Sequence, residues 1–209
     1  MVTSVSTDSR KVTPGALLVP IRGERTDAHA YIPATFAAGA AATLTQNHSE
    51  MQDNHVWIAV PDTVEALRRI AAAYRSRFNI PVIGVTGSVG KTTTKEMVAL
   101  ALSARWNTMK TEGNQNSQVG LPLTMFRLEP EHEVAVIEMG MSDFGEMGRL
   151  AQIARPQYAV MTNIGVSHIQ QLGTQENILA EKLHITDAFL PVPFFSSMAT
   201  IRILRVCAI

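Results

Sequence analysis

The residues VIGVTGSVGKTTTKEM, at positions 82–97, decide the fold of the larger part of this chain. An apolar, partly β-branched run of strand length (81–87) leads into a glycine-containing turn, and a helix-favouring segment (91–106) follows it. The turn and the start of the helix contain Gly87, Ser88, Val89, Gly90, Lys91, Thr92 and Thr93. Glycines in such a turn let backbone N–H groups approach phosphate oxygens, and the helix N-terminus adds the positive end of its dipole. The stretch therefore predicts a loop that binds nucleotide phosphates.

The strict form of this loop, G-x-x-x-x-G-K-[ST], requires glycine where Val85 stands. A G-K-T triplet is common by chance, but here it follows an apolar strand and opens a helix. In that context Lys91 would reach the β- and γ-phosphates, and the Thr92 hydroxyl would be a ligand of Mg²⁺. The alternative is a glycine-rich turn that carries a surface lysine.

Beyond the loop the chain alternates strand-like and helical segments. Strands are predicted at 106–111, 133–140 and 158–165, and helices at 145–154 and 176–189. Apolar strands separated by helices are typical of a parallel sheet buried on both faces. The fold class is therefore α/β.

The N-terminal part has shorter elements and is predicted to be a separate small α/β domain, residues 1–79, followed by a second domain, residues 80–190. Its predicted strands are 16–21, 41–45 and 56–60, and its predicted helices are 30–40 and 63–78. The proline-containing segment NIPV at 79–82 interrupts the helical pattern and marks the boundary.

The last residues, 191–209, contain no acidic residue and no glycine, unlike the rest of the chain. Only four convincing strands precede them, whereas a nucleotide-binding sheet of this kind usually has about five or six. We therefore expect an incomplete second domain and an aberrant tail that packs poorly, as a reading-frame error or a truncated gene would produce.

Composition excludes several classes of function. The 209 residues include 18 basic and 18 acidic residues without a block of like charge, so nothing indicates a grip on nucleic acid. No apolar run reaches the roughly 20 residues of a membrane span, and the polar N-terminus is not a signal peptide. The single cysteine, Cys207, fits a reducing compartment. The predicted location is cytoplasmic, without membrane insertion.

Two polar residues follow predicted strands at what should be one edge of the sheet. Glu138 ends the strand at 133–140, and His168 comes just after 158–165. Ligands of open α/β sheets collect at the carboxyl ends of strands, and a carboxylate there suits Mg²⁺. Taken singly, Glu138 could be a capping carboxylate, His168 a structural histidine, and Lys182 an ordinary surface lysine.

Together these residues resemble the Mur ligase family, ATP-dependent enzymes that form amide bonds in peptidoglycan precursor synthesis. GVTGSVGKTTTKEM (84–97) is similar to the family loop T-G-x-x-G-K-[ST], which does not require the first glycine, so Val85 is accommodated. IEMG (137–140) and TNIGVSH (162–168) resemble the family's metal-binding glutamate and histidine segments. TQENILAEKLHI (174–185) resembles the segment of its carbamylated lysine, which falls on Lys182.

The resemblance implies a set of functional residues. ATP would be held by the loop, residues 87–93, and Mg²⁺ by Thr92, Glu138, His168 and Lys182. The implied catalytic residues are Lys91, His168 and Lys182. Cationic neighbours and burial would lower the pKa of Lys182, so that its neutral amine could add CO2 and become an anionic metal ligand.

The segment STDSRKVTPGALLVPIRGERTDAHAYI (6–32) is similar to the family's UDP-sugar-binding domain. It would place Asp8, Ser9 and Arg10 near the diphosphate of the nucleotide sugar. Ala28 and Ala30 depart from the family's usual D-G-H-D-[FY], which puts the shape of that turn in doubt. Asn114 and Asn116 are weaker candidates for substrate contacts, because asparagines also form turns.

Within the family, TEGNQNSQVGLPLT (111–124) and EMGMSDFGEMGRLAQIARP (138–156) look most like the branch that adds D-alanyl-D-alanine to UDP-N-acetylmuramoyl-tripeptide. These two compounds are the expected partners of a monomeric enzyme. The family's C-terminal domain has no counterpart in the sequence, so residues 1–209 alone should not catalyse appreciable ligation. Two other readings stay open: a tripeptide-forming, folate or cyanophycin relative, and a non-catalytic fragment that binds nucleotide or UDP-sugar. The N-terminal segments TDSR (7–10) and PGALL (14–18) argue against the folate branch.

Overall fold

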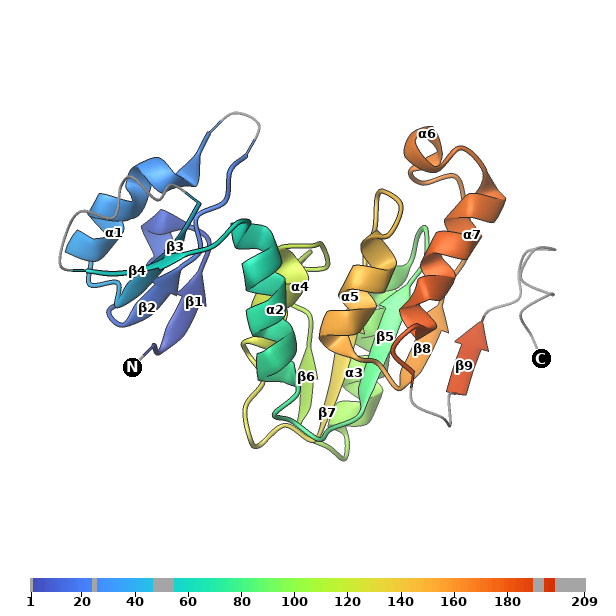
Figure 1. Ribbon diagram of the computed structural model, residues 1–209. Coiled ribbons are helices and arrows are strands. Elements are labelled where there is room, and N and C mark those ends of the chain that lie inside the picture. The colour runs from blue at the N-terminus through green and yellow to red at the C-terminus, as the bar shows by residue number, and fades with distance from the viewer. Residues whose placement is uncertain (1, 24–25, 47–54, 190–193, 198–209) are drawn as a thin grey trace. The chain divides into compact units, whose positions relative to one another are not determined.

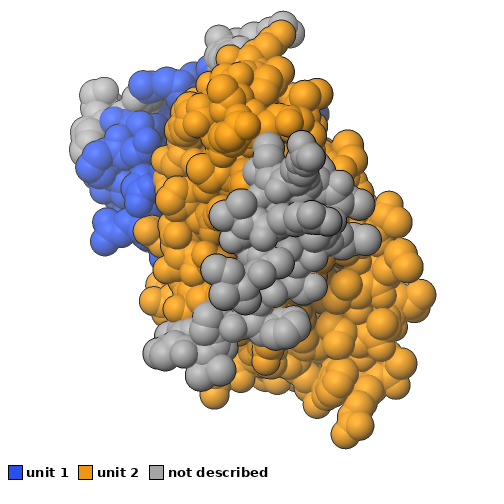
Figure 2. All heavy atoms as spheres, turned by 90° about the vertical axis from the view of Figure 1, so that its right-hand side faces the viewer, with its two compact units in different colours: residues 1–70 blue, residues 71–209 orange. Residues whose placement is uncertain are grey.

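The computed structural model describes residues 2–23, 26–46, 55–189 and 194–197. The chain forms two compact units, residues 1–70 and 71–209, which are coloured separately in Figure 2. The division between them falls inside helix α2 (Thr63–Arg75), upstream of the boundary expected after residue 79.

Unit 1 contains a four-stranded parallel sheet in the order β1-β2-β3-β4 (Figure 1). Its elements are β1 (Ser4–Ser6), η1 (Ser9–Lys11), β2 (Ala16–Leu18), η2 (Ala28–Tyr31), α1 (Ile32–Ala37), β3 (Ala42–Thr45) and β4 (Val56–Ala59). Leu18, Ile32, Phe36 and Ala40 pack together as its core. The sequence did not predict β1, because Ser-Val-Ser carries no apolar run.

Unit 2 contains a five-stranded parallel sheet in the order β6-β7-β5-β8-β9 (Figure 1). Its strands are β5 (Val82–Thr86), β6 (Thr108–Lys110), β7 (Val134–Glu138), β8 (Tyr158–Met161) and β9 (Phe194–Ser197). The strand-to-helix turn predicted at 87–90 joins β5 to α3, and the predicted parallel α/β layer is confirmed.

The helices of unit 2 are shorter than the sequence predicted at several ends. They are α3 (Lys91–Ser103), α4 (Gly120–Met125), α5 (Glu146–Ala154), α6 (Ile169–Leu172), α7 (Gln175–Leu183) and the 3₁₀ turn η4 (His184–Thr186). No helix within the described residues is both long and apolar enough to cross a membrane.

Strand β9 lies in the tail that the sequence analysis set apart from the second domain. It pairs in parallel with β8, from Tyr158 opposite Phe194 to Met161 opposite Ser197. The alternation of strands therefore continues past residue 190, and the sheet has a fifth strand that was not predicted. The remaining tail residues, 191–193 and 198–209 with Cys207, lie outside the described residues.

The central strand β5 brings the phosphate-loop candidate to the carboxyl edge of the sheet. It pairs with β7 on one side and β8 on the other, so Glu138 and Met161 end at the same edge as Thr86. Gly84 has a packing role in this strand, because a Cβ there would lie 2.9 Å from Ile185 Cδ1 and 3.0 Å from Met139 Sδ.

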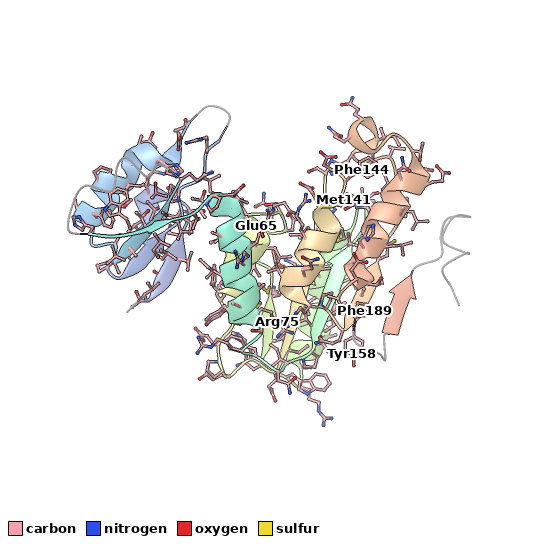
Figure 3. The ribbon with its side chains drawn as sticks, viewed as in Figure 1. Glu65, Arg75, Met141, Phe144, Tyr158 and Phe189 are labelled. Atoms are coloured by element: carbon pink, nitrogen blue, oxygen red, sulfur yellow. The ribbon has the colours of Figure 1, made fainter. Side chains whose placement is uncertain are left out.

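A buried arginine ties together the chain segments at the opposite edge of this sheet. The Arg75 side chain, labelled in Figure 3, is buried, and its Nε donates to the carbonyl oxygen of Ala154 at 3.0 Å. Its two Nη atoms donate to the carbonyl oxygens of Phe78 and Ile80. Burial lowers the pKa of this guanidinium, and the nearby Arg155 adds to the effect.

Replacing Arg75 by methionine should therefore lower the free energy of unfolding by about 2–4 kcal/mol, because one buried and two partly buried carbonyl oxygens lose their donors. Urea unfolding followed by circular dichroism measures this loss. Arg75→Lys restores one donor at most, so it should recover only a small part of the stability. Full stability in Arg75→Met would contradict the assigned role.

Candidate functional site

The loop between β5 and α3 has the backbone that close approach to phosphate requires. Gly87 has φ of 145° and Gly90 has φ of 81°, conformations that side chains with a Cβ rarely adopt. The Lys91 ammonium curls back and donates to the carbonyl oxygen of Gly87 at 3.0 Å. The first turn of α3 has N–H groups without partners inside the helix, and these point toward the loop.

The segment that follows β8 holds this loop in shape. Ser88 N–H donates to the Asn163 carbonyl oxygen at 3.0 Å, and Val89 N–H donates to Asn163 Oδ1 at 3.0 Å. Thr162 Oγ1 in turn donates to the carbonyl oxygen of Val89 at 2.6 Å. Sequence reasoning read TNIGVSH only for its histidine, although polar residues directly after a neighbouring strand were the available signal.

Glu138, at the end of β7, is buried and faces the first turn of α3. Its Oε2 accepts from Thr92 Oγ1 at 2.9 Å, and its Oε1 accepts from Asn116 Nδ2 at 2.6 Å. Its backbone N–H donates to Thr111 Oγ1 at 2.9 Å. Both side-chain donors are neutral, so neither offsets the charge of an ionised carboxylate.

These atoms fit the requirements of Mg²⁺, which takes oxygen ligands at about 2.1 Å in octahedral geometry. Thr92 Oγ1 and Glu138 Oε2, which are joined by a hydrogen bond of 2.9 Å, are close enough to be adjacent ligands of one ion, which lie about 3.0 Å apart in that geometry. Among the described residues, no three His, Cys, Asp or Glu side chains form a cage for a metal. In general, protein-bound Mg²⁺ is held by one or two carboxylates and keeps phosphate and water oxygens as its other ligands.

The three residues predicted to be catalytic, Lys91, His168 and Lys182, line one cavity of about 290 Å³ in unit 2. Its other walls include Gly87, Ser88, Asn116, Gln118, Gly140, Met141, Glu146 and Ser167. Met141, labelled in Figure 3, marks the wall just before α5. Asn116 joins the cavity to the Thr92–Glu138 pair, because it lines the first and donates to the second.

A larger cavity, of about 660 Å³, lies elsewhere in unit 2 and contains none of the predicted site residues. It is lined by Arg75, Ser76, Phe78, Asn79, Gln152, Arg155, Gln157, Asp187, Ala188 and Phe189. Size alone does not mark a reactive site, whereas the smaller cavity gathers a loop, two lysines and a histidine.

Lys182 lies on α7 with only 2% of its surface exposed. Burial, and secondly the charge of Lys91, lower the pKa of its ammonium to about 8, although Glu181 opposes the shift. His168, by contrast, is exposed and stands in the left-handed region, with φ of 65°, at the start of α6. The structure therefore brings these two residues to one cavity, and their roles stay predictions.

The predicted substrate residues of unit 1 form a local pair. Arg10 Nε donates to Asp8 Oδ1 and Arg10 Nη2 to Asp8 Oδ2, both at 2.9 Å, and Ser9 lies between them at the start of η1. The hydrogen bond from the Arg10 side chain is the main cause that lowers the pKa of Asp8 to about 2. Asn114 contributes a turn contact, because its carbonyl oxygen accepts from Asn116 N–H at 2.8 Å.

The turn at 27–31 forms with Ala28 and Ala30 in place. Asp27 Oδ1 accepts from His29 N–H at 3.0 Å and lies 2.6 Å from His29 Nδ1. The buried His29 ring also accepts from Gln46 N–H through Nε2 at 3.2 Å. Asp27 and His29 therefore supply the side-chain contacts of this turn, and neither alanine disrupts it.

A phosphate loop at the centre of a parallel sheet, with a carboxylate and a buried lysine beside it, has a match among known families. The family description "Mur ligase middle domain" matches residues 85–194, more than half of the chain. "Mur ligase family, catalytic domain" matches residues 1–75. The chain belongs to the Mur ligase family.

Two relatives within this family are named as D-alanyl-D-alanine ligases. UDP-N-acetylmuramoyl-tripeptide–D-alanyl-D-alanine ligase of Bacillus subtilis (strain 168) is 45% identical over 186 residues, which cover 88% of this chain and 41% of the relative. The Synechocystis enzyme of the same name is 42% identical over 185 residues, again 88% of this chain and 41% of the relative. The chain thus spans about two fifths of the length of these relatives.

Solved MurF structures are similar to this chain in fold. MurF ligase from Thermotoga maritima in complex with ADP has a TM-score of 0.89 and 32% identity, with coverage of 97% of this chain and 47% of that one. MurF from Acinetobacter baumannii has a TM-score of 0.88 and 32% identity, with coverage of 97% and 45%. Both are what this chain is similar to in fold and in sequence.

Proposed function

We propose that this chain binds the phosphates of ATP with residues 87–93 and holds Mg²⁺ with Thr92 and Glu138. The observation that supports this most directly is the pair of oxygen atoms at 2.9 Å, which lies beside a loop of phosphate-binding shape. Asn116 holds the second carboxylate oxygen and so fixes which oxygen faces Thr92. The domain roles follow: residues 1–79 would bind UDP-sugar, and residues 80–190 would bind ATP.

The reaction proposed for the whole protein is the one that the names of its relatives state: D-alanyl-D-alanine is added to UDP-N-acetylmuramoyl-tripeptide. A carboxylate is a poor electrophile, so the peptide carboxylate first takes the γ-phosphoryl group of ATP. The amine of D-alanyl-D-alanine then attacks the acyl phosphate, the amide bond forms, and phosphate leaves. Phosphoryl transfer between anions depends mainly on positioning and on charge neutralisation.

The residues of this chain would divide that work among themselves. Lys91 neutralises the β- and γ-phosphate oxygens from the loop. A bound Mg²⁺ would supply further charge neutralisation at the same oxygens. His168 and Lys182, which line the same cavity, would take part in a second metal site near the peptide carboxylate. The low pKa of Lys182 supports addition of CO2 to its neutral amine, which would give a carbamate oxygen as ligand.

On the substrate side we propose that Asp8, Ser9 and Arg10 bind near the diphosphate of the UDP-sugar. The side chain of Arg10 is 86% exposed, so its guanidinium is open to a phosphate. Binding of the diphosphate would require the Arg10 guanidinium to divide its hydrogen bonds between Asp8 and phosphate, or to break those with Asp8. We also propose that the protein acts as a cytoplasmic monomer.

Calorimetric titration with ADP, with and without MgCl2, tests the binding part of the proposal. We expect saturable binding that Mg²⁺ strengthens. A phosphate-release assay with ATP, UDP-N-acetylmuramoyl-tripeptide and D-alanyl-D-alanine then separates binding from turnover. Absence of ADP binding in a folded chain would contradict the proposed function.

Replacing Lys91 by methionine should weaken ADP binding by about 30- to 100-fold, because the charge-assisted contacts of its ammonium with phosphate are lost. The matched control is Lys110→Met, which removes a lysine that lies outside the cavity. ADP affinity of Lys110→Met should stay within about twofold of the wild type. Equal affinities in both variants would show that Lys91 does not contact the phosphates.

A further inference from the structure

One turn after Lys91, α3 carries a second lysine with an unusual environment. Lys95 has only 1% of its surface exposed and is among the largest fully buried side chains of the described residues. Its ammonium donates to the carbonyl oxygen of Thr111 at 2.7 Å and lies 2.7 Å from Glu96 Oε1. Lys95 does not line the cavity that contains Lys91 and Lys182.

Thr111, whose carbonyl oxygen accepts from Lys95, also contacts strand β7, which carries Glu138. It is fully buried just after β6, and its N–H donates to the Val136 carbonyl oxygen at 3.1 Å. Its hydroxyl accepts from the backbone N–H of Glu138 at 2.9 Å. A continuous path of hydrogen bonds therefore runs from Lys95 on α3 through Thr111 to Glu138 on β7.

The charge of Lys95 is balanced by a half-exposed carboxylate at the next position. Glu96 forms ion pairs with both Lys95 and Lys110. The hydrogen bond from Lys110, and secondly that from Lys95, lower the pKa of Glu96 to about 2. Because the Lys95 ammonium is paired and does not line the cavity, it is not placed to contact a phosphate there.

We propose that Lys95 is a positioning residue for the metal site, an inference that rests on the proposed function. Thr92 and Lys95 lie three residues apart on α3 and so share a side of the helix. The Lys95 ammonium connects that side of the helix to the Thr111 carbonyl oxygen, and the Thr111 hydroxyl accepts from the backbone N–H of Glu138. The 2.9 Å separation between the Thr92 hydroxyl and Glu138 Oε2 is therefore set by the Lys95–Thr111 link.

The test compares how much MgCl2 strengthens ADP binding in the wild type and in Lys95→Met. We expect ADP affinity without Mg²⁺ to stay within about threefold of the wild type, because the loop itself is unchanged. The strengthening by Mg²⁺ should fall by about tenfold, the size of loss that follows removal of an outer-shell partner of a metal ligand. Lys110→Met is the matched control, since it breaks the other ion pair of Glu96 and leaves Thr111 untouched; it should keep the full Mg²⁺ effect.

Two further variants guard against a folding defect in Lys95→Met. Thr111→Val keeps the shape of the side chain but removes the acceptor of the Glu138 N–H. The strengthening of ADP binding by Mg²⁺ should therefore fall as it does in Lys95→Met, while ADP affinity without Mg²⁺ is kept. Lys95→Arg, which keeps a buried donor, should recover part of the effect.

A full Mg²⁺ effect in both Lys95→Met and Thr111→Val would overturn the positioning role. So would an equal loss of ADP affinity with and without Mg²⁺, which would indicate a general disturbance of α3. If the wild type itself shows ADP binding without any effect of Mg²⁺, the proposed metal site fails, and the role of Lys95 fails with it.

Discussion

Replacing Gly87 by alanine is expected to lower ADP affinity by about 100-fold or more, a change of about 2.7 kcal/mol. A Cβ at this position would lie 2.0 Å from Thr162 Oγ1 and 3.2 Å from the backbone N and O of Asn163. Two of these atoms hold the loop in place, because Thr162 Oγ1 donates to the carbonyl oxygen of Val89 and the Asn163 carbonyl oxygen accepts from the Ser88 N–H. The added methyl group therefore has to displace the support of the loop.

The matched control for this variant is Gly113→Ala. Gly113 also has positive φ, 53°, but nothing lies within 4 Å of the Cβ position. That variant should cost only the backbone strain, about 1 kcal/mol of stability, and leave ADP affinity nearly unchanged. Calorimetry gives the affinities, and circular dichroism shows that both variants are folded. If the ADP affinity of Gly87→Ala is within threefold of the wild type, the contacts of Thr162 and Asn163 with the loop are not needed for ADP binding.

Replacing Lys182 by methionine should stabilise the chain at neutral pH. In the folded protein burial lowers the pKa of the ammonium from the model-peptide value of 10.5 to about 8. At neutral pH the folded state therefore bears the cost of a buried charge, which the unfolded state does not. Removing that charge should raise the free energy of unfolding by about 1–3 kcal/mol at pH 7.

The pH dependence gives this prediction a distinctive sign. Below pH 8 both states of the wild type are protonated at Lys182, and the cost is fully present. Between pH 8 and 10.5 the folded state loses the proton while the unfolded state keeps it, so wild-type stability rises relative to Lys182→Met. The excess in the free energy of unfolding of Lys182→Met over the wild type should thus shrink between pH 8 and 10.5 and vanish above pH 10.5.

Urea unfolding at several pH values, followed by Trp106 fluorescence in a Trp57→Phe background, reports on unit 2, which contains Trp106. Lys110→Met, which removes a half-exposed lysine, should show no such shrinking difference. A stability difference for Lys182→Met that is constant from pH 7 to 10 would disprove the buried-charge explanation.

The elements with strong periodic signals were predictable from the sequence. The β5–loop–α3 unit, the buried strand β7 and the helix that carries Lys182 were found because apolar runs and polar turns alternate there. Strand β1 and helix α4 were missed, because Ser4–Ser6 has one apolar residue and α4 contains a glycine and a proline. Strand β9 was missed because the composition of its surroundings differs from that of the preceding domain.

The candidate site was only partly predictable, for a physical reason. Residue type and family resemblance identified Lys91, Thr92 and Glu138, but they could not show which groups support them. Asn163 and Thr111 act through backbone and hydroxyl contacts between segments far apart in the chain. Such contacts leave no periodic pattern, and a lysine in a helix is ordinarily exposed, so the burial of Lys95 was not foreseen.

The hydrogen bonds that join the loop to Thr162 and Asn163 also bear on the order of folding. They join residues 73 and 74 positions apart in sequence, and closing so long a segment is slow compared with forming a local turn. On the ribosome, α3 can form as soon as it emerges, yet the loop before it stays without its support until the 158–163 segment has been synthesised. Nucleotide binding would therefore begin only after β8 has paired with β5, which makes ADP protection a reporter of a late step in the assembly of unit 2.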